Sequence, residues 1–148
     1  MMGQTTSGTT LGISLVLPAT EDAAGYDALT FIDIGELTNL DEYGRVYNEV
    51  TSNPLATRRT RKYKGQYDEG SPSMTVDREG ADAGQVAAKS ALALDTNVAF
   101  AVTHQDGSID YFSAKVMSFT NSVGGADSMY EANIQLGIDT DIIEVAAP

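Results

Sequence analysis

The sequence contains no cysteine and no tryptophan, and its 148 residues include one histidine and four prolines. Without cysteine the chain cannot form disulfides, bind zinc or iron–sulfur clusters through thiolates, or use a thiol nucleophile. Basic residues are scarce: nine lysines and arginines stand against 21 acidic residues, for a formal net charge of −12. Because duplex binders neutralise phosphates with Lys and Arg, this composition argues against a free-standing nucleic-acid-binding protein.

Long apolar runs and targeting signals are missing as well. No segment reaches the ~20 apolar residues that cross a bilayer. Residues 1–10 are polar and rich in Gly and Thr, which predicts an N-terminal arm and not a secretory signal. We therefore expect a soluble intracellular product without membrane insertion, folded around one core as a single domain over 1–148.

Hydrophobic periodicity predicts a mainly β chain with one α-helix. Strands are expected at 11–17, 29–34, 36–43, 71–77, 97–104, 109–120 and 129–138, with turn-rich loops at 20–27, 105–108 and 121–127. Antiparallel hairpins with a single helix predict a small antiparallel β-sandwich or half-barrel.

The helix is expected at 82–94. Asp82 is its predicted N-cap, and Gln85 stands three residues later, as in a capping box. The residues that recur at helical spacing, and so form the predicted packing face, are Val86, Ser90, Ala91 and Leu94.

The last strand alternates clearly. Its predicted apolar face comprises Tyr130, Ile134, Leu136 and Ile138, and its polar face comprises Glu131, Asn133, Gln135 and Asp139. The short strand at 71–77 offers a second polar set, Ser73, Thr75 and Asp77.

Segment 44–70 has no sustained apolar period, and five of the nine basic residues lie between Arg58 and Lys64. Three interpretations are open: a nucleic-acid patch, a cationic arm that docks onto an acidic copy of the same chain, and a solvated loop. The strongly negative remainder of the chain favours the cationic arm, as a long loop or hairpin. The predicted contact residues are Arg58, Arg59, Arg61, Lys62, Tyr63, Lys64 and Tyr67.

No catalytic, cofactor-binding or metal site is predicted. His104 precedes a hairpin turn; it is either a general base with Asp106 or Asp110, or a solvent-exposed residue at a strand end, which we favour. The carboxylate doublets lack the alternating spacing of a calcium loop and are expected at the surface or in subunit contacts: Glu21-Asp22, Asp41-Glu42, Asp68-Glu69 and Asp139/Asp141.

Several segments, in order, resemble the tail tube protein (major tail protein) of long, non-contractile-tailed bacteriophages of the siphophage type. They are 8–13 (GTTLGI), 31–37 (FIDIGEL), the arm 43–67, 77–85 (DREGADAGQ), 106–119 with its FSAKVMS run, and 121–125 (NSVGG) with the last strand. The resemblance covers nearly the whole chain, and the DREGADAGQ and FSAKVMS runs are its most specific parts.

The resemblance implies a structural virion protein that is not an enzyme and needs no cofactor. Such proteins form hexameric rings that stack into a hollow tube, and their inner sheets join into one wide barrel. The N-terminal arm and the long loop bridge to neighbouring subunits. The implied partners are other copies of the chain, the tape measure protein, the tail terminator, distal tail proteins and passing double-stranded DNA. The implied location is the virion tail, assembled in the host cytoplasm.

A negative lumen would repel the DNA backbone and let the genome slide. The lumen-facing candidates are Glu131, Asn133 and Gln135, followed by Ser73, Thr75 and Asp77; the other interpretation is that these faces look out to bulk water. Two alternatives to a tube protein remain: a tail terminator or head–tail joining protein, and a non-polymerising acidic β-sandwich that binds a ligand such as carbohydrate.

Overall fold

The computed structural model describes residues 3–147, which form ten strands and two helices. The strands are β1 (Thr10–Ser14), β2 (Ile32–Asp33), β3 (Leu37–Leu40), β4 (Val46–Ser52), β5 (Arg61–Asp68), β6 (Ser73–Asp77), β7 (Val98–Thr103), β8 (Ile109–Ser122), β9 (Glu131–Ile138) and β10 (Ile143–Val145). The helices are α1 (Ala23–Asp27) and α2 (Ala83–Ala91). Within the described residues no helix is long and apolar enough to span a membrane.

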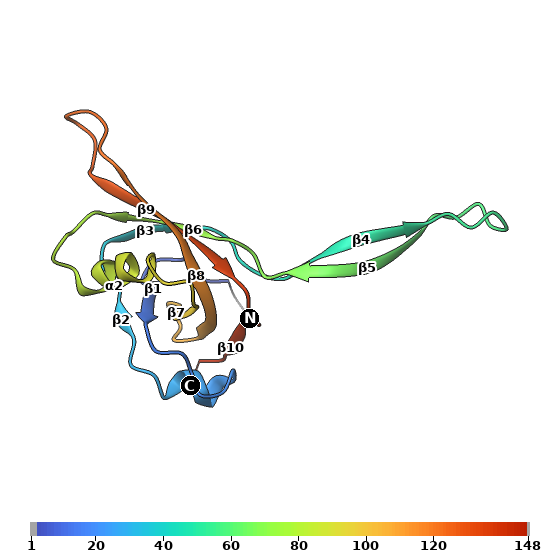
Figure 1. Ribbon diagram of the computed structural model, residues 1–148, viewed down its shortest axis with the longest axis horizontal. Coiled ribbons are helices and arrows are strands. Elements are labelled where there is room, and N and C mark those ends of the chain that lie inside the picture. Colours follow the sequence, from blue (N-terminus) through green and yellow to red (C-terminus); the bar gives the residue numbers. More distant parts are fainter. Residues whose placement is uncertain (1–2, 148) are drawn as a thin grey trace.

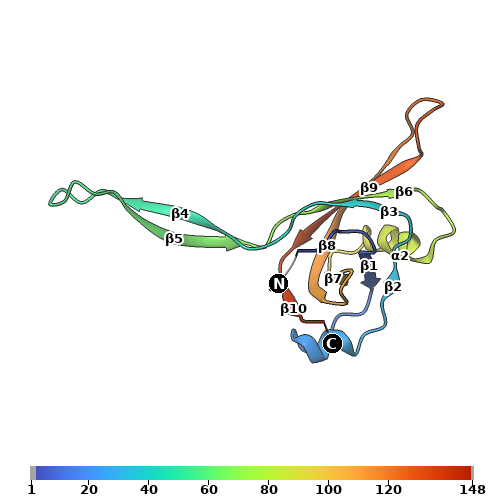
Figure 2. The same cartoon turned by 180° about the vertical axis from the view of Figure 1, so that it is seen from behind.

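Eight strands form one sheet in the order β2-β1-β7-β8-β9-β6-β3, with β10 paired to β8. Every pairing is antiparallel, and the sheet curls into a half-barrel (Figures 1 and 2). Strands β4 and β5 form a separate two-stranded sheet that projects away from this body. The predicted fold class, mainly β with antiparallel half-barrel strands, is confirmed.

The core has two parts because β7 is buried on both of its faces. Val98, Phe100 and Val102 face the larger cluster, where Phe100 stacks on Phe112 at 5.6 Å between ring centroids. The intervening Ala99 and Ala101 face the smaller cluster on the other side of the sheet. Helix α2 packs against the larger cluster through Ala87, Ala88 and Ala91, so the sheet is covered on both sides at this point.

Helix α1 is a correction, since residues 20–27 were predicted to be a loop. A helix of five residues is too short to produce a helical period in the sequence. It is held by its cap, where Asp22 Oδ1 accepts a 2.7 Å hydrogen bond from Gly25 N. It is also anchored by Tyr26, which is buried, stacks on Tyr111 and hydrogen-bonds Ser113. The hydrogen bond from Gly25 N lowers the pKa of Asp22.

Helix α2 begins as predicted and ends earlier, at Ala91 in place of residue 94. Asp82 Oδ2 accepts from the backbone N–H of both Gln85 and Gly35, each at 3.0 Å. Gln85 does not close a capping box. It is fully buried, and its amide donates to the carbonyls of Gly35 and Asp77.

The predicted packing face of α2 is therefore wrong in part. Val86 and Leu94 are 48% and 43% exposed, and Ser90 is exposed, whereas Ala91 is buried as expected. The buried Gln85 fixes the rotation of the helix, so that small residues face the sheet: Gly84, Ala87, Ala88 and Ala91.

Several strand boundaries also differ from expectation. The segment 11–17 leaves the sheet after Ser14, and of 29–34 only Ile32 and Asp33 pair as a strand. Their apolar neighbours serve other contacts, since Leu29 and Phe31 pack against the smaller core cluster. Tyr130, placed on the apolar face of the last strand, precedes β9 and is 46% exposed. Met1 and Met2, in the predicted N-terminal arm, lie outside the described residues.

Candidate functional site

The two predicted polar sets lie side by side on one face of the sheet. The β6–β9 register places Ser73 opposite Gln135, Thr75 opposite Asn133, and Asp77 opposite Glu131. The intervening residues, Met74, Val76, Ala132, Ile134 and Leu136, are buried. Strands β6 and β9 are therefore apolar toward the core and polar on the opposite face.

The same polar face extends over two further strands, β8 and β3, whose residues were not among the predicted lumen-facing candidates. On β8, Ser118, Thr120 and Ser122 lie opposite Gln135, Asn133 and Glu131, and on β3 Asn39 lies opposite Thr75. A register shift between Val116 and Ser118 breaks the alternation along β8. In the sequence, the one feature that could have indicated a polar face on β8 is the hydroxyl residue at every second position after this shift, namely Ser118, Thr120 and Ser122.

The polar face consists mainly of hydroxyl and amide groups. We define it as Asn39, Ser73, Thr75, Asp77, Ser118, Thr120, Ser122, Glu131, Asn133 and Gln135. Only Asp77 and Glu131 in this set are charged, and they are cross-strand neighbours at one end. The face is thus weakly acidic and carries no cation.

Both outer edges of this four-stranded part are unpaired within residues 3–147. Strand β3 ends the sheet and pairs only with β6. Strand β8 pairs with β7 through residues 109–114, but its distal part, 116–122, pairs only with β9. An unpaired edge exposes backbone N–H and C=O groups and is a template for pairing with another chain.

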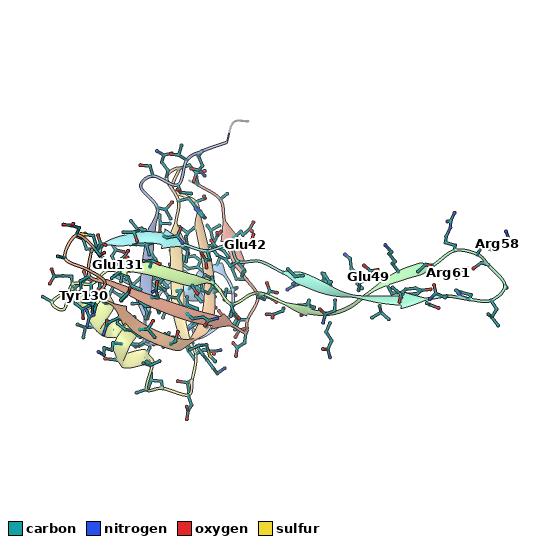
Figure 3. The ribbon with its side chains drawn as sticks, turned by 90° about the horizontal axis from the view of Figure 1, so that it is seen from above. Glu42, Glu49, Arg58, Arg61, Tyr130 and Glu131 are labelled. Atoms are coloured by element: carbon teal, nitrogen blue, oxygen red, sulfur yellow. The ribbon has the colours of Figure 1, made fainter. Side chains whose placement is uncertain are left out.

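The β4–β5 hairpin carries the predicted contact residues. Figure 3 shows that it extends from the body toward Arg61 and Arg58, at the opposite end of the molecule from Tyr130 and Glu131. The register pairs Tyr47 with Tyr67 and Val50 with Tyr63. These four side chains are 39–53% exposed. Because positions 47 and 50 differ by an odd number along β4, these two pairs lie on opposite faces of the hairpin, and neither face is covered by other described residues.

The basic residues of the hairpin are exposed, and Lys62 lies 3.8 Å from Glu49 across the strand pair. Lys64 lies over the Tyr47 ring at 4.7 Å from its centroid. The assignment of these residues to contacts with another subunit stays a prediction.

His104 is half-buried, with 30% of its side chain exposed, which corrects the expectation of a solvent-exposed strand-end residue. Its Nε2 lies 2.8 Å from Asp110 Oδ2, and the Tyr43 hydroxyl donates to the same oxygen. Burial first, and then this hydrogen bond, raises the pKa of Tyr43 above its ordinary value, so Tyr43 stays a neutral donor.

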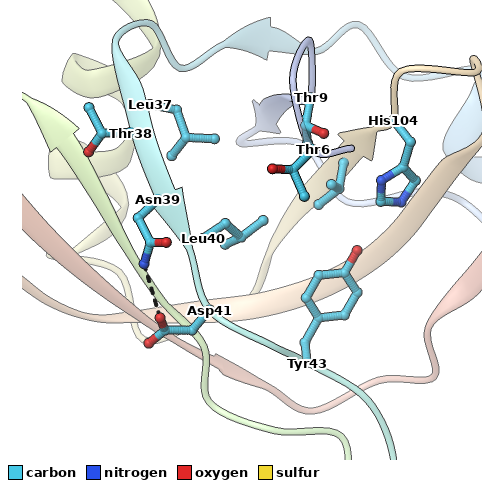
Figure 4. A pocket seen from close by; sticks show the side chains of 10 residues that line it. Thr6, Thr9, Leu37, Thr38, Asn39, Leu40, Asp41, Tyr43 and His104 are labelled. Atoms are coloured by element: carbon cyan, nitrogen blue, oxygen red, sulfur yellow. Dashed lines mark hydrogen bonds between the residues drawn. The ribbon is translucent and has the colours of Figure 1, made fainter. Parts of the chain in front are cut away.

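Tyr43 and His104 border a cavity of about 290 Å³ between β3 and the N-terminal segment (Figure 4). Its lining includes Thr6, Thr9, Leu37, Leu40, Tyr43 and His104. The Asp110 carboxylate therefore has two partners, His104 and Tyr43. Since Tyr43 lies just before β4, these three residues join the base of the β4–β5 hairpin to the β7–β8 hairpin.

The carboxylate doublets are mostly surface groups, with one exception. Glu69 is 6% exposed and pairs with Arg45, whose Nε lies 2.7 Å from its Oε1. Asp139 pairs with Lys115 at 2.6 Å. In the part of the chain that the structure describes, no group of three or more His, Asp or Glu residues is arranged to hold a metal ion.

Comparison with solved structures identifies the same architecture in tail assemblies. One match is a chain in the tail of an empty gene transfer agent particle, solved with helical refinement and C6 symmetry, with a TM-score of 0.70, 14% identity, and coverage of 97% of this chain and 100% of that chain. Another is a chain in the SPP1 tail tube, with a TM-score of 0.64, 17% identity, and coverage of 92% and 75%. A third is a chain in the sheath/tube terminator of an extracellular contractile injection system, with a TM-score of 0.67, 11% identity, and coverage of 99% of each chain.

No protein-family model matches the chain, and no curated protein matches it in sequence. At these identities the structural likeness defines the fold, which is the fold of chains in tail-tube-like assemblies. The neighbours include a contractile injection system as well as SPP1, so this fold does not single out the siphophage type.

Proposed function

We propose that this chain is a tail tube protein, copies of which form hexameric rings that stack into a hollow tube. The observation that carries the proposal is the four-stranded part β8-β9-β6-β3. It has a packed core on one face and, among the described residues, an uncovered polar face on the other and an unpaired outer edge along β3 and along the distal part of β8.

Strand direction supports closure of this sheet through several copies. All three pairings within the four strands are antiparallel, so β3 and β8 run in opposite directions. In a ring, β3 of one copy therefore meets the distal part of β8 of the next copy as a further antiparallel pair. Six copies of four strands give a barrel of about 24 strands, wide enough for an aqueous channel.

The polar face of this barrel lines the lumen in the proposed tube. Six copies carry six times −12, or a formal −72. The lumen offers no cation to the phosphates and is coated with neutral hydroxyl and amide groups, with Asp77 and Glu131 as its charges. Without released counterions, DNA gains no affinity and passes without tight binding.

The tube belongs to the virion tail of a bacteriophage of the siphophage type and is assembled in the host cytoplasm. It surrounds the tape measure protein before it conducts the genome to the host. Its ends meet the tail terminator and distal tail proteins. The chain has a structural role and performs no catalysis.

The β4–β5 hairpin is the inter-subunit arm in this proposal. The hairpin, residues 46–68, holds five basic residues against Glu49 and Asp68, a net charge of +3, which leaves −15 on the rest of the chain. Such a distribution favours contact between the arm of one copy and the body of another. The exposed pairs Tyr47–Tyr67 and Val50–Tyr63, one on each face of the hairpin, add area that binding would bury.

A second candidate function is a tail terminator or head–tail joining protein. The likeness to a chain in a sheath/tube terminator favours this class. The two candidates differ in their products, because a terminator stops at a single ring whereas a tube protein continues to add rings.

Disulfide cross-linking tests the lateral contact, because the parent chain contains no cysteine. Asn39→Cys on β3 is combined in turn with Ser118→Cys, Thr120→Cys and Ser122→Cys on β8, which cover the possible registers. At least one combination should give a ladder of cross-linked species that ends at six copies on a non-reducing gel. Each single variant is the control and should give no ladder.

Electron microscopy of the same samples separates the candidates. Long tubes support the tube protein, and single rings support the terminator. A chain that stays monomeric at high concentration, with no ladder in any register, would contradict both.

A further inference from the structure

The arm leaves the body through two glycines that lie at the same level. Gly44 has a φ of 147° and Gly70 a φ of 109°, backbone conformations that residues with a Cβ rarely adopt. Gly44 N donates a 2.9 Å hydrogen bond to Glu69 O, and a Cβ on Gly70 would lie 3.7 Å from Gly44 N. Both legs of the arm therefore turn at one place, which forms a hinge.

The body side of this hinge is fixed. Tyr43 packs against Phe112, with 5.5 Å between ring centroids, and its hydroxyl donates to Asp110. On the other leg, Gly70 O accepts a 3.1 Å hydrogen bond from Ile138 N of β9. Motion of the arm would thus begin beyond these contacts.

Arg45 spans the hinge. It follows Gly44, and its Nε donates to Glu69 Oε1 at 2.7 Å while its guanidinium lies 4.1 Å from the centre of the Tyr67 ring. Both partners belong to the arm side. Its Nη2 donates to Asp141 Oδ1 at 2.7 Å, and Asp141 lies in the link between β9 and β10 on the body.

The chemistry of the site explains why an arginine is placed here. The Glu69 side chain is only 7% exposed, and a buried carboxylate needs a cationic partner. A planar guanidinium can serve this carboxylate and a second one at once, which the compact lysine ammonium does less well. Glu69 and Tyr67 hold the guanidinium, and its Nη2 reaches Asp141 on the body.

We propose that Arg45 is a positioning residue whose bridge to Asp141 locks the direction of the arm in the unassembled protein. A hairpin of two strands has little stability of its own. An arm with a fixed direction loses less conformational entropy when it docks, which strengthens binding without any new contact. The gain in docking affinity rests on the proposed function, whereas the fixed direction of the arm does not.

Distance measurement between two spin labels tests the lock in the full chain. The labels are attached to Leu55→Cys at the arm tip and to Asp95→Cys between α2 and β7, both exposed positions. The sample is kept where size-exclusion chromatography gives a monomer. The parent should give one narrow distance distribution.

Asp141→Ala is the decisive variant because it removes the bridge and leaves the Arg45–Glu69 pair intact. The Asp141 side chain is 66% exposed, so the body should stay folded. An exposed ion pair biases a two-state equilibrium by on the order of twofold to fivefold, so the distribution should broaden or gain a second population. Arg45→Lys should broaden it as well, because lysine lacks the second forked donor.

Lys115→Ala is the matched control. It removes another ion pair, with Asp139, whose two side chains are 41% and 46% exposed, and the hydrogen bonds of Lys115 run to Asn97 and Asp139, both outside the arm. Its distribution should equal that of the parent. A broad parental distribution, or an Asp141→Ala distribution equal to the parental one, would overturn the proposal. Failure to form tubes would instead contradict the proposed function, and the spin-label distances measured in the monomer would still stand.

Discussion

Thr75 Oγ1 donates a 2.9 Å hydrogen bond to Asn133 Oδ1 across the β6–β9 pair. These residues come from two segments almost sixty positions apart in the sequence, each predicted separately to carry a polar face. The contact makes them neighbours on one surface. This surface is the proposed lumen, and it defines the first prediction.

Accessibility of single cysteines should distinguish an inward from an outward polar face. In the monomer, Asn133→Cys should react with a bulky maleimide. In assembled tubes, Asn133→Cys should react with the bulky maleimide at least about tenfold more slowly than with a small maleimide. The reason is that a lumen-facing cysteine can be reached only from the tube ends, which slows the bulky reagent most.

Val86→Cys is the matched control, since Val86 is exposed on α2, on the other side of the core. It should react with both reagents in monomer and tube. Equal protection at both positions, or none at Asn133→Cys, would mean that the polar face does not line the lumen. The measurement is the labelled fraction over time by mass spectrometry.

Neutralising the arm should block polymerisation without unfolding the monomer. Arg58, Arg59 and Arg61 are exposed and lie at or beside the arm tip. We expect the triple Gln variant to form no tubes under negative-stain microscopy while its thermal unfolding matches that of the parent. Single surface ion pairs contribute only about 0–1 kcal/mol, so their repetition around a ring is required.

The triple Lys variant separates charge from shape. It keeps all three positive charges and should still assemble, although added salt should weaken assembly of both parent and variant by screening. Normal tubes from the triple Gln variant would show that the arm does not dock through these charges.

Gln85 should be a large contributor to stability. Its side chain is fully buried; it donates to the carbonyls of Gly35 and Asp77 and accepts from Glu79 N at 2.9 Å. Gln85→Leu leaves these groups without partners, so we expect the free energy of unfolding to fall by about 2–4 kcal/mol in urea. The neighbouring Val86→Ala, on the exposed side of α2, should change it by less than about 0.5 kcal/mol.

Tyr43 should make the protein sensitive to alkaline pH. Burial and the bond to Asp110 raise its pKa, so the unfolded chain loses this proton from about pH 10 while the folded chain keeps it. A raised pKa contributes stability that is present below the unfolded value and is lost as pH rises toward the folded value. The free energy of unfolding should therefore decline above about pH 10.

Tyr43→Phe tests this dependence. It should lower stability at neutral pH by about 1 kcal/mol, through loss of the hydrogen bond, and reduce the alkaline slope. Tyr111, whose pKa is also raised by burial, remains in the variant and accounts for part of the slope that persists. An unchanged slope would rule out Tyr43 as the titrating group.

Much of the fold followed from local patterns. Alternation in β9 separated buried Ile134 and Leu136 from exposed Asn133 and Gln135, because strand side chains point to opposite faces. Asp82 was identified as a helix cap because its side chain can serve the unpaired N–H groups of the first turn. Local patterns did not predict helix α1 or the buried face of α2. In these helices Tyr26 and Gln85 are held by Ser113 and Gly35, which are far away in the sequence.

The sequence by itself predicted most strands of the large sheet, though not β10, together with the polar and apolar faces of β6 and β9 and a basic segment in an acidic chain. Each of these depends on the spacing or charge of residues within one segment. Only the tertiary structure decided that the two polar sets adjoin, that β3 and the distal part of β8 each have one edge without a partner within residues 3–147, and that Arg45 joins the arm to Asp141. Pairing and register depend on which distant segments pack together, and no local period in the sequence encodes that choice.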